Sequence, residues 1–160
     1  LVHKTLVDNG DRVVSIVPTY QQHFSIPKSI GADVHFLNLR EENNWLPDLD
    51  ELKRLVLPRT KLIALTNPNN PTGSLIDKEM LNEIADIANT AASWILCDEV
   101  YRGTDQHGSG MTASIADIYE KGISTAGMSK AFSLAGLRLG WVTARTSLIE
   151  DVMILSLIHI

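Results

Sequence analysis

Short runs of β-branched and other apolar residues recur along the chain, and turn-forming or charged residues follow most of them. The run Arg12–Val17, which ends at Pro18, is representative. Runs of this length and composition are typical of buried β-strands. The pattern therefore predicts six strands, at residues 12–17, 34–39, 61–66, 94–97, 123–126 and 138–143.

Apolar residues recur at intervals of three and four between most of these runs, which indicates amphipathic helices. We expect helical segments at residues 1–7, 20–30, 47–56, 76–91 and 115–120. Gly31 is a suitable stop for the second segment, and Ser74 with Asp77 resembles a capping box for the fourth.

Strands that alternate with helices predict an α/β fold with a mostly parallel sheet, because parallel neighbours need a crossover between them. Such sheets have helices on both faces, so we expect three layers. Ligands of these folds bind beyond the carboxyl ends of the strands. Polar residues follow four of the predicted strands and should share one edge of the sheet: Tyr20, Asn67–Gly73, Asp98–Tyr101 and Ser129-Lys130.

Composition and charge narrow the possible functions. The chain has 160 residues, of which 44% are hydrophobic, and this is enough for one domain with a buried core. A formal net charge of −5, without any cluster of lysine and arginine, gives no support for a nucleic-acid or membrane partner. The single cysteine, Cys97, excludes an intrachain disulfide and fits a reducing compartment, so we expect a cytoplasmic location.

Three motifs follow the third, fourth and fifth predicted strands: Asn67-Pro-Asn-Asn-Pro-Thr-Gly73, Cys97-Asp-Glu-Val-Tyr101, and Ser129-Lys-Ala-Phe132 with Leu137-Arg-Leu-Gly-Trp141. Alone, each has a plain structural explanation, such as a proline-locked turn, an acidic strand end, or a solvated lysine near an ion-paired arginine. Together and in this order, they closely resemble the motifs of class I and II aminotransferases, enzymes of fold type I that depend on pyridoxal phosphate (PLP). The resemblance covers residues 2–154 and implies the central part of the family's large domain.

The resemblance implies that PLP is the cofactor and that Lys130 is the catalytic residue. Lys130 would form a Schiff base with PLP and later move the α-proton of the substrate, while PLP accepts the electron pair released at the α-carbon. Asp98 matches the aspartate that keeps the pyridine nitrogen protonated. Tyr101 and Asn70 match the two donors to the phenolic oxygen of the cofactor.

The phosphate group and the ring face of PLP have their own expected contacts. Arg138 matches the arginine that binds the phosphate through two nitrogens, and Tyr20 matches the aromatic residue that stacks on the ring. Gly127 departs from the pattern, because many members of the family have a serine or threonine there to bind phosphate. Ser129 or Thr125 could supply that hydroxyl instead.

Both ends of the chain differ from what the resemblance implies for a complete enzyme. The family's glycine-rich phosphate loop would precede Leu1, and its arginine for the substrate carboxylate would follow residue 154. We therefore expect residues 1–154 to be a partial PLP-binding large domain, truncated at both ends. Leu155-Ser-Leu-Ile-His-Ile160 is the translation of CTG TCT CTT ATA CAC ATC, the mosaic-end sequence of a transposon adaptor. We expect residues 155–160 to be a tail that is not native.

The leading interpretation is an aminotransferase that acts on an amino acid and a 2-oxo acid and forms a homodimer when full length. The same motifs also occur in PLP-dependent β-eliminating lyases and cyclising synthases, so that alternative stays open. A third possibility is that the chain by itself is a non-catalytic fragment. A dinucleotide-binding protein is discounted because no Gly-x-Gly-x-x-Gly follows the first strand, and a metal site because the five histidines lack the spacing of ligands.

Overall fold

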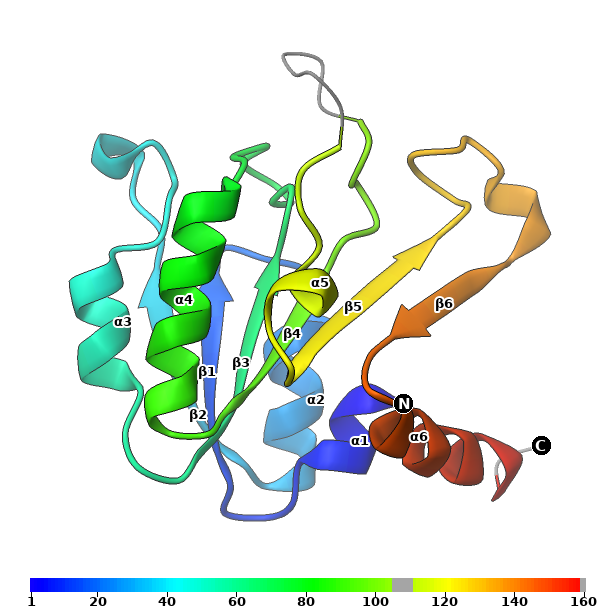
Figure 1. Cartoon of the computed structure of the whole chain (residues 1–160), viewed down its shortest axis with the longest axis horizontal. Helices are drawn as coiled ribbons and strands as arrows, with labels where there is room; N and C mark the ends of the chain where they lie inside the picture. The colour runs from blue at the N-terminus through cyan, green and yellow to red at the C-terminus, as the bar shows by residue number, and fades with distance from the viewer. Residues whose placement is uncertain (105–110, 159–160) are drawn as a thin grey trace.

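The computed structural model describes residues 1–104 and 111–158, and a six-stranded sheet lies at its centre (Figure 1). The strands are β1 (Arg12–Val17), β2 (Asp33–Asn38), β3 (Thr60–Thr66), β4 (Trp94–Asp98), β5 (Gly122–Gly127) and β6 (Gly140–Thr143). Their order across the sheet is β2-β1-β3-β4-β5-β6. Strands β1 to β5 run parallel, whereas β6 runs antiparallel to β5. The predicted α/β class and mostly parallel sheet are therefore confirmed.

Helices cover both faces of the sheet, which confirms the three predicted layers (Figure 1). One face packs against α3 (Leu49–Leu55), α4 (Lys78–Thr90) and α5 (Ile115–Ile118), and the other against α1 (Val2–Leu6), α2 (Gln22–Ile30) and α6 (Thr146–Ile158). The strands supply both cores because successive side chains point to opposite faces. Val13 and Val14, for example, are both fully buried but belong to different cores.

Aspartates cap the N-termini of α3 and α4, which pack on the same face of the sheet. Asp48 accepts hydrogen bonds from two backbone N–H groups of α3, both at 2.9 Å. Asp77 accepts one from the N–H of Met80 at 2.8 Å and begins α4 in the same way. The predicted capping box is therefore wrong, because Ser74 lies before the helix and its hydroxyl donates to the carbonyl of Trp45 at 2.9 Å.

The last predicted strand is shorter than expected. It begins at Gly140 and not at residue 138, because Arg138 has a left-handed backbone (φ 51°) at the end of the 3-10 turn η2 (Ala135–Leu137). The hydrophobic pattern also fails to predict α6, whose apolar residues lie on all sides and give no helical period. Across residues 1–104 and 111–158, no helix has both the length and the apolar character needed to cross a membrane.

Candidate functional site

The loops after β1, β3, β4 and β5 lie at the same edge of the sheet, as predicted, because these four strands are parallel. Hydrogen bonds join each loop to the next. The hydroxyls of Thr19 and Thr66 lie 2.9 Å apart between the first two loops, and the N–H of Asn67 donates to the carbonyl of Asp98 at 3.0 Å. The N–H of Glu99 in turn donates to the carbonyl of Thr125 at 2.8 Å. The polar residues of the edge therefore form one connected region.

The asparagine-rich turn after β3 is held by side chains that the sequence did not single out. Asn67 is 1% exposed, and its amide group donates to the carbonyl of Ile76 at 3.0 Å and accepts from the N–H of Ile76 at 2.9 Å. Asn69 donates to the carbonyl of Pro18 at 3.2 Å and so links the turn to the loop after β1. The predicted cofactor ligand Asn70 lies half-buried in the same turn. Asn67 and Asn69 therefore fix the backbone that holds Asn70.

Asp98 ends β4 and lies largely inside the protein. Its Oδ1 accepts hydrogen bonds from the N–H of Val100 at 3.2 Å and from the hydroxyl of Thr125 at 3.4 Å. Burial raises the pKa of Asp98 above its ordinary value, and these two hydrogen bonds oppose the rise. In the part of the chain that the structure describes, Oδ2 accepts no hydrogen bond, so this oxygen is suited to a cationic N–H donor.

The position of Thr125 bears on which hydroxyl, that of Thr125 or that of Ser129, is available to the cofactor phosphate. Its hydroxyl faces the Asp98 carboxylate, so of the two candidates Ser129 is better placed to supply a phosphate ligand. Close packing of the backbone also explains why residue 127 is a glycine and not a serine or threonine. A Cβ atom there would lie only 3.1 Å from the carbonyl oxygen of Leu139, because β5 and β6 approach closely at this point.

Lys130 and Tyr101 are brought together from different loops. The Lys130 Nζ atom lies 5.8 Å from the centroid of the Tyr101 ring. Lys130 is exposed in the turn after β5, and Tyr101 is half-buried in the turn after β4. Residues of the second and third motifs thus lie within reach of one small molecule.

Three further predicted residues lie in the loops at this edge of the sheet, and within residues 1–104 and 111–158 their side chains make no hydrogen bond to Lys130 or Tyr101. Tyr20 is 49% exposed in the loop after β1. Ser129 is half-buried beside Lys130 in the chain. Arg138 is exposed, and its Nη1 donates to the carbonyl of Ala135 at 3.3 Å. Lys130 and Arg138 lie on the same loop between β5 and β6.

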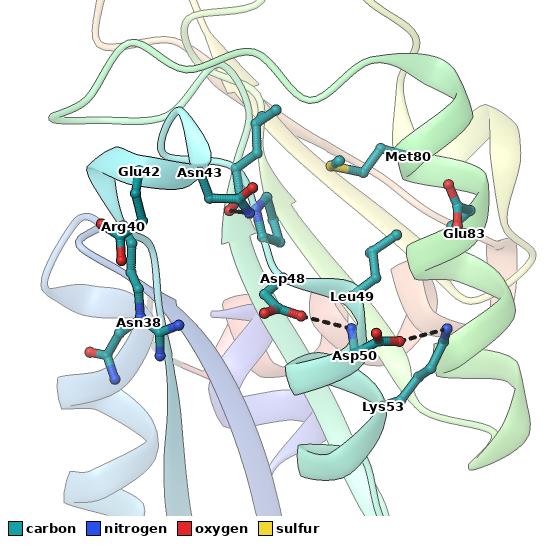
Figure 2. Close-up of a pocket in the computed structure, with 12 residues that line it drawn as sticks. Asn38, Arg40, Glu42, Asn43, Asp48, Leu49, Asp50, Lys53, Met80 and Glu83 are labelled. Carbon is teal, nitrogen blue, oxygen red and sulfur yellow. Dashed lines mark hydrogen bonds and ion pairs between the residues drawn. The ribbon is translucent and has the colours of Figure 1, made fainter.

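A hollow beside α3 and α4 is a poor alternative site (Figure 2). It is lined by acidic residues in excess of basic ones, and several of these charges already have partners. Asp48 caps α3, the Lys53 Nζ atom lies 3.3 Å from Asp50, and Arg40 lies 3.2 Å from Glu51. Both of its basic side chains are therefore already paired with carboxylates, and the hollow is poorly suited to an anionic ligand.

The chemistry of the strand-edge residues fits PLP. The free oxygen of Asp98 suits a protonated ring nitrogen, and the phenol and amide of Tyr101 and Asn70 are donors for an anionic oxygen. Lys130 has the primary amine that an aldehyde requires. Arg138, on the same loop as Lys130, has the guanidinium group that suits a phosphate.

Comparison with known proteins points to one family. The family model "Aminotransferase class I and II" matches residues 2–157. An aspartate aminotransferase of Pyrococcus horikoshii is 35% identical over 94% of this chain and 39% of its own length. A glutamate-pyruvate aminotransferase of Haemophilus influenzae is 36% identical over 87% of this chain and 35% of its own length.

Solved structures give the same result for the fold. A PLP-dependent aminotransferase from Streptococcus suis superimposes with a TM-score of 0.89 and 44% identity, over 94% of this chain and 39% of the other. An aspartate aminotransferase mutant of Thermus thermophilus gives a TM-score of 0.87 with 26% identity, over 94% of this chain and 41% of the other. The chain thus spans about two fifths of the length of the proteins it matches.

Proposed function

The chain belongs to the class I and II aminotransferase family, and on this basis we propose that the complete protein is a PLP-dependent aminotransferase that transfers an amino group between an amino acid and a 2-oxo acid. One observation supports this most directly. The amine of Lys130 lies beside the Tyr101 ring at the edge of the sheet where Asp98 also ends its strand. This is the combination of amine, phenol and carboxylate that the cofactor requires.

When bound, PLP supplies an electron sink for the α-carbon of the amino acid. In the proposal, the Nζ atom of Lys130 would hold the cofactor, and the same amine would move a proton at the α-carbon of the substrate. The carboxylate of Asp98 holds a proton on the ring nitrogen of the cofactor. Its burial favours this, because an unpaired buried carboxylate gains from a cationic partner.

The other predicted residues orient the cofactor in this proposal. The Tyr101 hydroxyl and the Asn70 amide donate to the phenolic oxygen, and the Tyr20 ring lies against the cofactor face. Arg138 and Ser129 bind the phosphate. We also propose that the complete protein is a homodimer, as the family resemblance implies, and that it is located in the cytoplasm, which fits its single cysteine.

The reaction is tested by measuring whether product formation needs a 2-oxo acid. Relatives are named for aspartate, alanine, and glutamate with pyruvate, so these amino acids and their 2-oxo acids are the first substrates to supply. An aminotransferase turns over only when both are present. Release of pyruvate and ammonia from a cysteine derivative without any 2-oxo acid would instead identify a β-eliminating lyase, and a cyclised product would identify a synthase.

The role of Lys130 is tested in the complete protein with Lys130→Ala. We expect the visible absorption of the lysine-bound cofactor to disappear and the activity to fall by a factor on the order of 10² or more. Lys53→Ala is the matched control, because Lys53 is an exposed lysine on α3 that pairs only with Asp50. A wild-type protein without this absorption, or a Lys130→Ala variant that keeps it, would contradict the proposal.

A further inference from the structure

Glu99, the residue after Asp98, is a buried carboxylate that the proposed reaction does not use. It is 3% exposed. Its Oε1 accepts hydrogen bonds from the hydroxyl of Ser114 at 3.0 Å and from the N–H of Ile115 at 2.8 Å. Burial of a carboxylate costs free energy of folding unless hydrogen bonds replace those lost to water, and Ser114 and Ile115 supply such hydrogen bonds to Glu99.

Arg102 extends the same set of contacts. Its Nε donates to the carbonyl of Thr112 at 2.6 Å and lies 3.9 Å from Oε2 of Glu99. The backbone N–H of Arg102 also donates to the carbonyl of Glu99 at 2.8 Å. Together, Glu99 and Arg102 join the turn after β4 to residues 112–115, which lead into α5.

The joined turn is the one that holds two of the proposed cofactor ligands. Asp98 precedes Glu99 and Tyr101 follows it by two positions, so the backbone around Glu99 determines where both side chains lie. Successive residues of a strand point to opposite faces. Asp98 contacts Thr125, whereas Glu99 contacts Ser114 and Ile115 at the start of α5. Glu99 can therefore fix the turn without occupying space beside the cofactor.

We propose that Glu99 is a positioning residue for the cofactor: by binding Ser114 and Ile115, its carboxylate holds the turn that presents Asp98 and Tyr101 to PLP. The proposal rests on the proposed function. This role of Glu99 differs from a role in folding alone. The position of the turn determines how Asp98 meets the ring nitrogen of the cofactor and how Tyr101 meets its phenolic oxygen. Two properties of the holoenzyme should therefore depend on Glu99, namely cofactor affinity and the pH at which the visible absorption changes.

The test compares Glu99→Ala with Glu99→Gln in the complete holoenzyme. The alanine variant loses both hydrogen bonds to Oε1, so we expect PLP to bind about tenfold more weakly and the pH midpoint of the visible absorption to shift. The glutamine variant keeps an amide oxygen that can accept from Ser114 and Ile115, and it should recover most of the affinity. Glu83→Ala is the control, because Glu83 is an exposed residue of α4.

Three outcomes would overturn the proposal: unchanged PLP affinity and pH midpoint in Glu99→Ala, a change in melting temperature alone, or the same loss in the glutamine variant as in the alanine variant. If Glu99→Ala does not fold, Ser114→Ala decides, because it removes one of the two donors and should change the affinity and the midpoint in the same direction by a smaller factor. No change in Ser114→Ala would then overturn the proposal. A wild-type protein that forms no visible complex with PLP would instead refute the proposed function, so the two failures are distinguishable.

Discussion

The hydroxyl of Thr125 donates a hydrogen bond of 3.4 Å to Oδ1 of Asp98. The two residues are partners in the register of β4 and β5, so the contact is set by the sheet itself. It is also one of two hydrogen bonds that oppose the effect of burial on the pKa of Asp98. Thr125 is thus one of the residues that keep Asp98 ionised.

Thr125→Val should therefore raise the pKa of Asp98 further, and it removes a hydrogen bond that orients the carboxylate toward a cationic ring nitrogen. We expect the dissociation constant of PLP to rise by a factor of about two to ten, which corresponds to one hydrogen bond of ordinary strength. The constant is measured by titrating the complete protein with PLP and following the visible absorption. Thr143→Val in β6 is the matched control, and equal constants for both variants would contradict the role given to Thr125.

Tyr101→Phe removes the phenolic hydroxyl and leaves the aromatic ring beside Lys130 in place. We expect the pH midpoint of the visible absorption to rise, because an oxygen that loses a donor keeps more negative charge and holds the nearby proton to a higher pH. The turnover number should fall by about tenfold, as for one hydrogen bond to a charged group. Tyr119→Phe is the control, since its hydroxyl donates only to the carbonyl of Ser93, at 2.9 Å. A midpoint that moves equally in both variants would contradict the assignment.

Gly122→Ala should destabilise the protein. A Cβ atom at this position would lie 2.3 Å from the carbonyl oxygen of Ile115 and 2.9 Å from that of Tyr119, so backbone must move to admit it. Forced overpacking of this kind costs about 1–3 kcal/mol. Gly136→Ala is the control, because a Cβ atom there meets nothing within 4 Å. Urea unfolding of both variants measures the difference, and equal midpoints would show that the close approach at Gly122 is not present in solution.

His3 and His23 predict how stability depends on pH. Both are buried with their rings 6.0 Å apart, and burial lowers the pKa of each from 6.5 to about 4. The unfolded chain therefore takes up protons first as the pH falls below 6.5, so the free energy of unfolding decreases until about pH 4. At pH 5 each histidine should reduce it by roughly 2 kcal/mol relative to neutral pH.

The histidine prediction is checked with His3→Leu, which removes one of the two titrating groups. Urea unfolding of the complete protein is measured at pH 7 and pH 5, and the difference between the two pH values should be smaller in the variant than in the wild type. An identical difference in both proteins would mean that His3 is accessible to protons in the folded state.

Residues 155–160 give a prediction about the gene. If they come from a transposon adaptor, the locus amplified from DNA that never received the adaptor should encode other residues after residue 154. The measurement is direct sequencing of that DNA. Recovery of the same six codons would show that the tail is native.

The strands could be predicted from the sequence because a buried parallel strand is a continuous apolar run. Arg12–Val17 coincides with β1 residue for residue. The direction of β6 could not be predicted, because a short apolar run has the same pattern whichever way it is paired. The start of α4 was misjudged for a similar reason: Ser74 and Asp77 are both good helix caps, and only the contact of Ser74 with Trp45 distinguishes them.

The site was predictable as far as the motifs fix the type and order of residues. The motifs place Lys130 and Tyr101 in neighbouring loops, and the 5.8 Å contact agrees with this. They single out Asn70 as a cofactor ligand but do not show that Asn67 and Asn69 hold the turn, because those contacts depend on which way each side chain points. The contacts of Glu99 with Ser114 and Ile115 were likewise beyond the sequence, since they depend on which way a strand-end side chain points.

The antiparallel direction of β6 determines how the two proposed anchors of the cofactor are spaced. A parallel strand would begin at the opposite edge of the sheet, so the chain would first have to cross back along the sheet. The chain instead returns at the same edge through the loop 128–139, and the pairing of Gly127 with Gly140 fixes both ends of this loop, which holds Lys130 and Arg138. A slip of one residue between β5 and β6 would turn every side chain of one strand to the other face. The ends of the loop that holds the amine and the guanidinium are therefore fixed by strand registration, so a change of register should displace both proposed anchors of the cofactor.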